Sequence, residues 1–224
     1  MRGNFTVHPE IAAHRAIWDR KPILRAVYAD YYARILGFCR TGRTLEVGGG
    51  GGFLKRFHPA TIASDILPAP WLDVAADAEA LPFASASIDN IVAVDVLHHL
   101  PRPRRFFAEA ERVLVPGGRI VLLDPAITPA SYPFYRFLHP EPVTLGVDPL
   151  EDACAGPRDP FAANQAIPTL LFGRHGAAFA RAFPGLAVIE RRYLSLLAYP
   201  LSGGFRPWSA WPRSWVGWLL GLER

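Results

Sequence analysis

Cysteine and methionine are scarce in this chain. Its 224 residues include two cysteines, Cys39 and Cys154, and one methionine. Two cysteines are too few for a disulfide framework or a thiolate zinc site, so we expect a reducing compartment, by default the cytoplasm, and no bound metal. The sequence shows no apolar signal region and no run of the ~18 apolar residues that span a membrane, so neither export nor a transmembrane helix is expected.

Lysine is also scarce. Lys and Arg together number 24 against 20 Asp and Glu, yet Lys21 and Lys55 are the only lysines. No run of basic residues exceeds two, which argues against a surface that follows a phosphate backbone, and no nucleic-acid partner is expected. Half of the residues are hydrophobic and a fifth are charged, so the chain can bury a core and is not mainly disordered.

Strand and helix patterns alternate through the middle of the chain, which predicts a doubly wound, mainly parallel α/β sheet. Two helices are expected within 8–39 ahead of this sheet, and a further helix at 169–183 behind it. The predicted strands are 43–47, 61–65, 71–74, 88–94, 119–123, 186–192 and 193–199, with crossover helices beginning at 53–57 and spanning 103–115. Between 125 and 168 no period is visible, a length typical of a lid or substrate loop.

Five consecutive glycines, residues 48–52, follow the first predicted strand. Glycine allows sharp turns and close approach of the backbone to a ligand, which suggests a cofactor cradle. The dinucleotide pattern G-x-G-x-x-G fails because Phe53 or Leu54 stands at its last glycine, and a Walker loop would need Gly before Lys55. The spacing that does hold is an acid followed by three alternate glycines, Glu46-x-Gly48-x-Gly50-x-Gly52.

Acidic residues stand at the ends of four predicted strands: Glu46, Asp65, Asp95 and Asp124. In parallel sheets ligands bind outside the carboxyl ends of the strands, so the four acids outline a site. Asp65 follows Glu46 by 19 positions, a spacing that suits an acid on the hydroxyls of a ribose. Supporting roles for Glu46 and Asp124, and a helix cap for Asp95, remain open at this point.

With these motifs, residues 40–125 resemble the class I S-adenosylmethionine-dependent methyltransferases, nearer those that modify small molecules of quinone and lipid pathways. The resemblance rests on the glycine motif, Ser64-Asp65, Asp77-Ala78 before 81–83, Asp95 to His99, and the turn at 114–119. It implies a Rossmann-like sheet of seven strands, mainly parallel with a final antiparallel strand, and S-adenosyl-L-homocysteine as product.

The resemblance also implies cofactor contacts. The glycines would pack against the methionine portion, Glu46 would hold its amino end, and Asp65 would accept the ribose hydroxyls. Glycine at positions 49 and 51, where the family often carries a side chain, predicts a looser loop. The expected cofactor-binding residues are Glu46, Gly48, Gly50, Gly52, Asp65, Ile66, Asp77, Ala78 and Asp95.

Three histidines are candidate catalytic bases: His98, His99 and His139. A sulfonium is already activated, so positioning supplies much of the catalysis, but a histidine could take a proton from a hydroxyl, phenol or acid. Alternatively, His98 shapes the cofactor pocket, His99 packs in the core and His139 fixes a loop beside Glu141. No Asn-Pro-Pro-Tyr-like motif for amino-group methylation follows the fourth strand, and Asp95-Val96-Leu97-His98 in its place favours a small-molecule acceptor over adenine or protein nitrogen. Methylation of an oxygen or a carbon atom is expected.

Four of the six tryptophans lie in the last 17 residues, which form a tryptophan-rich amphipathic tail. Trp211, Trp215, Trp218 and Leu222 would share one helical face. Such a face suits a membrane interface, and a lipidic acceptor would follow from it. Docking of the tail on the domain itself, or on a second subunit of a homodimer, is the alternative.

The expected function is therefore methyl transfer from S-adenosylmethionine to a small, apolar or lipid-linked acceptor, in the cytoplasm or at the inner face of its membrane. An inactive methyltransferase-like protein that binds a nucleoside or a partner, and an RNA methyltransferase, are the alternatives. The expected segments are a helical cap (1–42), the cofactor-binding half (43–124), a lid or substrate insertion (125–168), the remaining helix and strands (169–204) and the tail (205–224).

Overall fold

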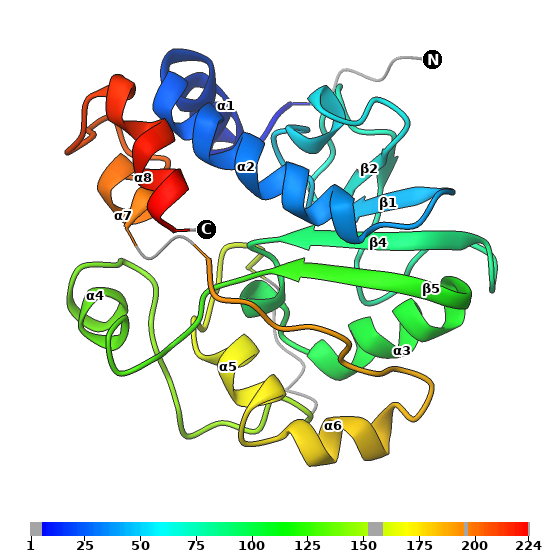
Figure 1. Cartoon of the computed structure of the whole chain (residues 1–224). Helices are drawn as coiled ribbons and strands as arrows, with labels where there is room; N and C mark the ends of the chain where they lie inside the picture. Colours follow the sequence, from blue (N-terminus) through cyan, green and yellow to red (C-terminus); the bar gives the residue numbers. More distant parts are fainter. Residues whose placement is uncertain (1–5, 152–158, 195–196, 224) are drawn as a thin grey trace.

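The computed structural model describes residues 6–151, 159–194 and 197–223, and within them a parallel sheet with helices on both faces (Figure 1). The strand order is β3-β2-β1-β4-β5, and every neighbouring pair is parallel. The strands are β1 (Thr44–Val47), β2 (Ile62–Asp65), β3 (Val74–Ala75), β4 (Ile88–Val94) and β5 (Leu114–Leu123). The order reverses between β1 and β4, the place where such sheets bind ligands.

Two hydrophobic clusters cover the two faces of the sheet. On one face, α1 and α2 pack over Val92 together with the C-terminal helices, while α3, α5 and α6 cover the opposite face at Leu45 and Ile91 (Figure 1). All four residues of β1 are buried, as expected for a central parallel strand. The helices are α1 (Pro9–Arg20), α2 (Pro22–Phe38), α3 (Pro103–Val113), α4 (Tyr132–Phe137), α5 (Ile167–Phe172), α6 (Gly176–Ala182), α7 (Ala198–Ser202) and α8 (Val216–Leu222), with 3-10 turns η1 (Leu54–Arg56), η2 (Leu97–His99) and η3 (Arg213–Trp215).

The predicted α/β fold and its parallel sheet are confirmed, but the end of the chain differs from the prediction. Positions 186–194 and 197–199 form no strand, and α7 begins at Ala198; positions 195 and 196 lie outside the described residues. Val188 and Ile189 are 59% and 78% exposed, so these apolar side chains are not buried in a sheet. The described residues thus contain five strands, without the final antiparallel strand.

Two predicted helices are also shorter than expected. The helix at 169–183 is divided into α5 and α6, because Gly173 leaves the helical conformation between them. The first crossover helix is reduced to η1, which ends before Pro59. Among the described residues, no helix is both long and apolar enough to cross a membrane.

Candidate functional site

A cavity of about 1740 Å³ lies at the carboxyl ends of the strands, between the N-terminal helices and the 125–168 segment. Eleven of the twelve residues expected at the site line it. Gly52 does not; a Cβ atom there would lie 2.8 Å from the Trp71 ring, so Gly52 makes room for that ring. The remaining predicted residues, Glu46, Gly48, Gly50, Asp65, Ile66, Asp77, Ala78, Asp95, His98, His99 and His139, are brought together.

The glycine loop takes a conformation that other residues would not tolerate. Gly48 has a φ of 66°, and a Cβ atom on it would lie 2.3 Å from Val96. The loop is nevertheless held firmly. The Gly49 amide donates to the Ser64 carbonyl at 2.8 Å, the Trp71 indole to the Gly50 carbonyl at 2.7 Å, and the Arg15 guanidinium to the Gly51 carbonyl at 2.9 Å. The structure thus shows three hydrogen bonds to the loop, while the looseness expected from the extra glycines stays a prediction.

Arg15 and Trp71, which the sequence did not indicate, contact the glycine loop without lining the cavity. The Arg15 guanidinium lies 3.9 Å from the centre of the Trp71 ring, so the two residues form one clamp over the loop. Arg15 belongs to α1 and Trp71 was predicted to be in a strand, and neither position carries a local signal for contact with the glycines.

Glu46 and Asp65 are two carboxyl groups in this half of the cavity. Glu46 is 4% exposed, and its Oε2 atom has no hydrogen-bond partner among the described residues. Burial raises the pKa of Glu46 to about 8; Asp65 adds to the rise and Lys55 opposes it. The carboxylate of Asp65 accepts the Gly50 and Leu67 amides at 2.8 Å each, which still leaves lone pairs for two hydroxyl groups.

These residues fit a nucleoside cofactor with a cationic amino end. A buried carboxylate oxygen without a partner calls for a donor, and an ammonium group would also offset the burial of Glu46. Beyond Asp65, the side chain of Ile66 is 40% exposed at the cavity, and Asp77 and Ala78 follow it in the lining. An apolar face flanked by an acid suits a purine ring with an exocyclic amine.

Asp95 lies between the two halves of the cavity. Its φ is 56°, in the left-handed region that few residues other than glycine adopt, and the Tyr28 hydroxyl donates to its Oδ2 at 3.0 Å. Burial raises the pKa of Asp95 to about 6, although neighbouring His98 lowers it. A left-handed aspartate held by a tyrosine at a strand end is typical of a binding site rather than of a helix cap.

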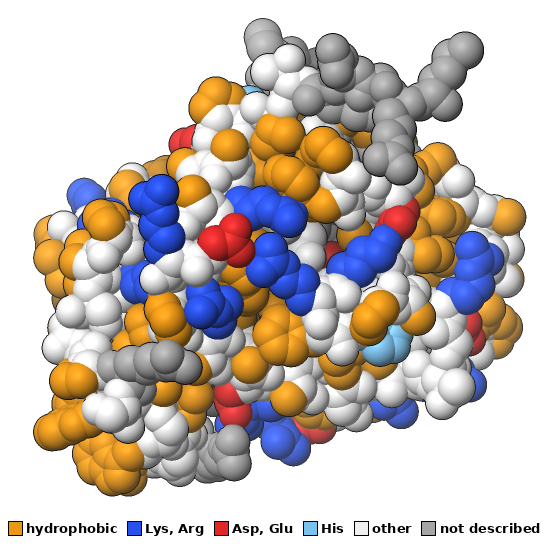
Figure 2. Space-filling model, turned by 90° about the horizontal axis from the view of Figure 1, so that it is seen from above, with side chains coloured by type: hydrophobic (Ala, Val, Ile, Leu, Met, Phe, Trp, Pro, Cys, Tyr) orange, Lys and Arg blue, Asp and Glu red, His pale blue; other side chains and the backbone are white. Residues whose placement is uncertain are grey.

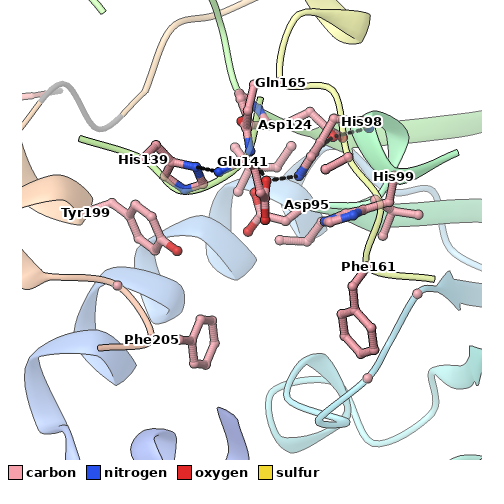
Figure 3. Close-up of a pocket in the computed structure, with 18 of the residues that line it drawn as sticks. Asp95, His98, His99, Asp124, His139, Glu141, Phe161, Gln165, Tyr199 and Phe205 are labelled. Carbon is pink, nitrogen blue, oxygen red and sulfur yellow. Dashed lines mark hydrogen bonds and ion pairs between the residues drawn. The ribbon is translucent and has the colours of Figure 1, made fainter. Parts of the chain in front are cut away.

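The three candidate histidines meet around Glu141, which comes from the 125–168 segment (Figure 3). His98 is 4% exposed, with Nδ1 2.8 Å from Asp124 Oδ1 and Nε2 3.4 Å from Glu141 Oε2. Burial lowers the pKa of His98, but the hydrogen bonds to Asp124 and Glu141 outweigh it and raise the pKa to about 10. Burial lowers the pKa of His99 and of His139.

Hydrogen bonds distinguish the other two rings. His99 Nδ1 lies 3.2 Å from the Ala162 carbonyl and so carries the proton, which leaves the lone pair on Nε2. His139 Nδ1 accepts the Glu141 amide at 3.3 Å, so its proton is on Nε2. Gln165, just before α5, donates to the Glu141 carboxylate and was not indicated by any motif.

Aromatic side chains form the other wall of the cavity. Tyr199 and Phe205 face the histidine cluster from the C-terminal segment, and Phe161 lies on the side of His99 (Figure 3). Phe134 and Tyr135 of α4 also line the cavity. These aromatic positions have no period in the sequence, so only the fold identifies them as a wall.

Residues 45–122 match the family model described as a methyltransferase domain. A phthiotriol/phenolphthiotriol dimycocerosates methyltransferase of Mycobacterium leprae is 39% identical over 100 residues, which cover 37% of each chain. The 27-O-demethylrifamycin SV methyltransferase of Amycolatopsis mediterranei is 44% identical over 55 residues, 25% of this chain and 20% of that one. The chain thus spans well under half the length of these relatives.

Two solved structures are similar over about half of the chain. A possible histamine N-methyltransferase of Thermotoga maritima is 22% identical, covers 47% of this chain and 55% of its own, and has a TM-score of 0.41. A putative methyltransferase of Bacillus halodurans is 23% identical, covers 48% and 57%, and has a TM-score of 0.39. Scores this low carry no argument, so the similarity to methyltransferases rests on the matched domain and on the curated relatives. Residues 45–122 of the chain are thus similar to a methyltransferase domain.

Proposed function

We propose that the chain transfers a methyl group from S-adenosylmethionine to an oxygen or carbon atom of a small acceptor that is apolar or lipid-linked. The observation that carries this proposal is the undivided cavity of about 1740 Å³, which holds both the nucleoside-fitting acids and the aromatic wall. A pocket for one small molecule is typically about 300–1,000 Å³. The cavity therefore has room for two ligands side by side.

The cofactor half of the cavity would bind and orient S-adenosylmethionine. Glu46 would hold the amino end, Gly48 and Gly50 would lie against the methionine portion, and Asp65 would hold the ribose hydroxyls. Ile66, Asp77 and Ala78 would take the adenine ring, and Asp95 would face the sulfonium end. The bound cofactor supplies an activated methyl group, so the protein contributes mainly alignment and exclusion of water.

The acceptor half begins at the histidine cluster. His98, His99 and His139 would surround the nucleophilic group of the acceptor, with His98 fixed by Asp124 and Glu141 and the Nε2 lone pair of His99 available to a donor. Phe134, Phe161 and Phe205 would exclude water from the apolar part of the acceptor. The names of the two relatives refer to phthiotriol/phenolphthiotriol dimycocerosates and to 27-O-demethylrifamycin SV, and they support a small-molecule acceptor.

Membrane contact is a further part of the proposal. The apolar residues Trp208, Trp215 and Trp218 are each about half exposed. Phe137, the last residue of α4, and Leu138, which follows it, are 75% and 68% exposed. Leu138 and Trp208 also line the cavity, so exposed apolar surface borders its opening. An acceptor embedded in a lipid surface would reach the cavity along this border.

Methyl transfer is tested with the purified chain, methyl-labelled S-adenosylmethionine and lipid extracts, with mass spectrometry to detect labelled products. We expect a labelled apolar product with the native chain and none with Asp65→Ala, whose loss of the ribose contact would weaken cofactor binding. Cofactor binding by calorimetry without a labelled product from any extract would favour a nucleoside-binding protein that transfers no methyl group. Absence of cofactor binding would overturn both.

A third class, an RNA methyltransferase, receives little support from the surface. On the face shown in Figure 2, Lys and Arg side chains stand among acidic and hydrophobic ones rather than in a continuous stripe. A phosphate-binding face requires clustered basic residues. Salt-dependent binding of RNA to the purified chain would instead support an RNA methyltransferase.

A further inference from the structure

His98, His99 and Glu141 form a group of potential metal ligands within the acceptor half of the cavity. One donor atom from each residue lies within 4.8 Å of the other two. His98 Nε2 and Glu141 Oε2 are 3.4 Å apart. Two ligands bound to the same ion at about 2.0–2.2 Å are separated by about 3.0–3.5 Å, so this pair already has the spacing of ligands to one ion.

The second nitrogen of each histidine is occupied in the way that metal-binding histidines require. His98 Nδ1 is bonded to Asp124 Oδ1 at 2.8 Å, and His99 Nδ1 to the Ala162 carbonyl at 3.2 Å. Such contacts to a carboxylate or a backbone carbonyl orient each ring with Nε2 toward the ion, and an ion bound at His98 would displace the proton from its Nε2. The backbone amide of His98 also donates to Asp124 Oδ1 at 3.2 Å, which holds the residue as well as its ring.

The surroundings of the group favour a positive charge. The Asp124 carboxylate lies 2.8 Å from His98 Nδ1, and its Oδ2 atom is buried without a hydrogen-bond partner among the described residues. Gln165 is 1% exposed; its amide nitrogen donates to Glu141, while its Oε1 has no partner in the described part of the chain. Water on a cation at this position could donate to Gln165 Oε1, an atom that the protein itself leaves unsatisfied.

We propose that His98, His99 and Glu141 bind one divalent first-row transition-metal ion, with Asp124 and the Ala162 carbonyl orienting the two histidines. Two imidazoles and one carboxylate suit Zn²⁺, Fe²⁺, Ni²⁺ or Mn²⁺ and leave coordination positions open. Those positions face the cavity and would bind water or an oxygen of the acceptor. Binding of an acceptor oxygen by the metal ion rests on the proposed function, whereas the metal site itself does not.

The test uses the full-length untagged chain, stripped with a chelator and titrated with ZnCl₂ in a calorimeter, and with CoCl₂ in a visible spectrophotometer. We expect one ion per chain, and absorption bands of Co²⁺ bound to nitrogen ligands. His99→Ala and Glu141→Gln should each weaken the Kd at least about tenfold, since each removes one ligand. His14→Ala is the matched control, because His14 lines the same cavity outside the group, and its Kd should stay within about twofold.

Thermal unfolding of the metal-free variants shows whether each is folded before its metal affinity is compared. The proposal is overturned if the native chain binds neither ion below about 1 mM, or if His14→Ala weakens binding as much as the two ligand variants. S-adenosylmethionine binding to the metal-free chain is measured separately. Cofactor binding without metal binding would contradict only the proposed metal site. Metal binding without cofactor binding would contradict only the proposed function.

Discussion

At the residue scale, Glu46 is the acid whose ionisation depends most on the fold. It is 4% exposed, and burial raises its pKa from 4.5 to about 8. Tyr32 and Asp65 lie near Glu46 and carry no positive charge to stabilise its carboxylate. Asp65 raises the pKa of Glu46 further, and the positive charge of Lys55 partly lowers it. The folded chain therefore keeps a proton that the unfolded chain loses above about pH 4.5. The associated stability is present in full below that pH and is lost as the pH rises through about 8.

We predict that the Glu46→Gln variant, whose side chain cannot ionise, does not lose this stability as the pH rises. Between pH 5 and 8, the free energy of unfolding of the native chain should fall relative to the variant by up to about 1.4 kcal/mol per pH unit. Urea unfolding without cofactor at four pH values measures the difference. Binding of S-adenosylmethionine near pH 6.5 should release a proton from Glu46 in the native chain only, seen by calorimetry in buffers of different ionisation enthalpy. Parallel stability profiles for the two proteins would contradict the prediction.

The clamp on the glycine loop can be tested at Trp71. Trp71→Phe keeps an aromatic ring under Arg15 but removes the indole N–H that donates to the Gly50 carbonyl at 2.7 Å. A hydrogen bond of this kind contributes about 0.5–1.5 kcal/mol, so we predict cofactor binding about two- to tenfold weaker, with little change in melting temperature. Trp215→Phe, at an exposed position, is the control and should leave the cofactor Kd unchanged. Equal affinity in the native chain and Trp71→Phe would show that the clamp does not shape the loop.

Some residues of the site could be predicted from the sequence, and others could not, for a physical reason. Gly48 and Asp65 are fixed by local chemistry, since a left-handed loop requires glycine and a strand end places an acid at a known distance along the chain. Arg15, Trp71 and Gln165 reach the site from separate segments. Their contacts depend on how helices pack on the sheet, which residue spacing does not encode.

At the scale of elements, buried strands were predicted well and the C-terminal segment was not. β4 spans the predicted 88–94 because a central parallel strand is a continuous apolar run between turns. The run at 186–192 is also rich in apolar residues, but Val188 and Ile189 are exposed and have no neighbouring strand. An apolar run becomes a strand only where another strand lies alongside it, and that condition is tertiary.

The α8 helix shows the same dependence on its neighbours. Its Leu219 and Leu220 are buried and pack with α2, while Trp215 just before it and Trp218 within it are 51% and 59% exposed. The tail therefore docks on its own domain through a face other than the tryptophan face. Docking and an exposed interfacial face, which were alternatives on sequence grounds, are compatible in the structure.

We predict that the two faces of the tail separate stability from membrane binding. Trp215→Ala with Trp218→Ala should lower binding to liposomes of anionic and neutral lipids at least about fivefold, while the melting temperature changes little, because both side chains are exposed. Leu219→Ala with Leu220→Ala should lower the free energy of unfolding by about 2–5 kcal/mol. Co-sedimentation and urea unfolding measure the two effects. Unchanged liposome binding, with a shift from dimer to monomer on sedimentation, would assign the tryptophan face to a second subunit instead.

At the scale of the whole molecule, the N-terminal helices and the C-terminal segment meet on one face of the sheet. Phe53, which follows the glycine loop, stacks on Trp18 of α1 with ring centres 4.0 Å apart and on Phe205 at 5.9 Å. The cofactor half and the aromatic wall are thus joined through a column of rings. Lys21, between α1 and α2, reaches the same segment and donates to the carbonyls of Gly204, Arg206 and Trp208 at 2.7–2.8 Å.

The two lysines of the chain provide a matched test of this connection. Lys21 is 8% exposed and satisfies three carbonyls of the loop that carries Phe205, whereas Lys55 pairs with Asp73 in solvent, with 31% and 40% of the two side chains exposed. We predict that Lys21→Met lowers the free energy of unfolding by about 2–4 kcal/mol, because the carbonyls lose a charged donor, and that Lys55→Met lowers it by less than about 1 kcal/mol. Hydrogen exchange should show faster exchange at 203–210 in Lys21→Met alone. Equal losses of stability in the two variants, or unchanged exchange at 203–210, would mean that packing of the rings rather than Lys21 holds the C-terminal wall of the cavity in place.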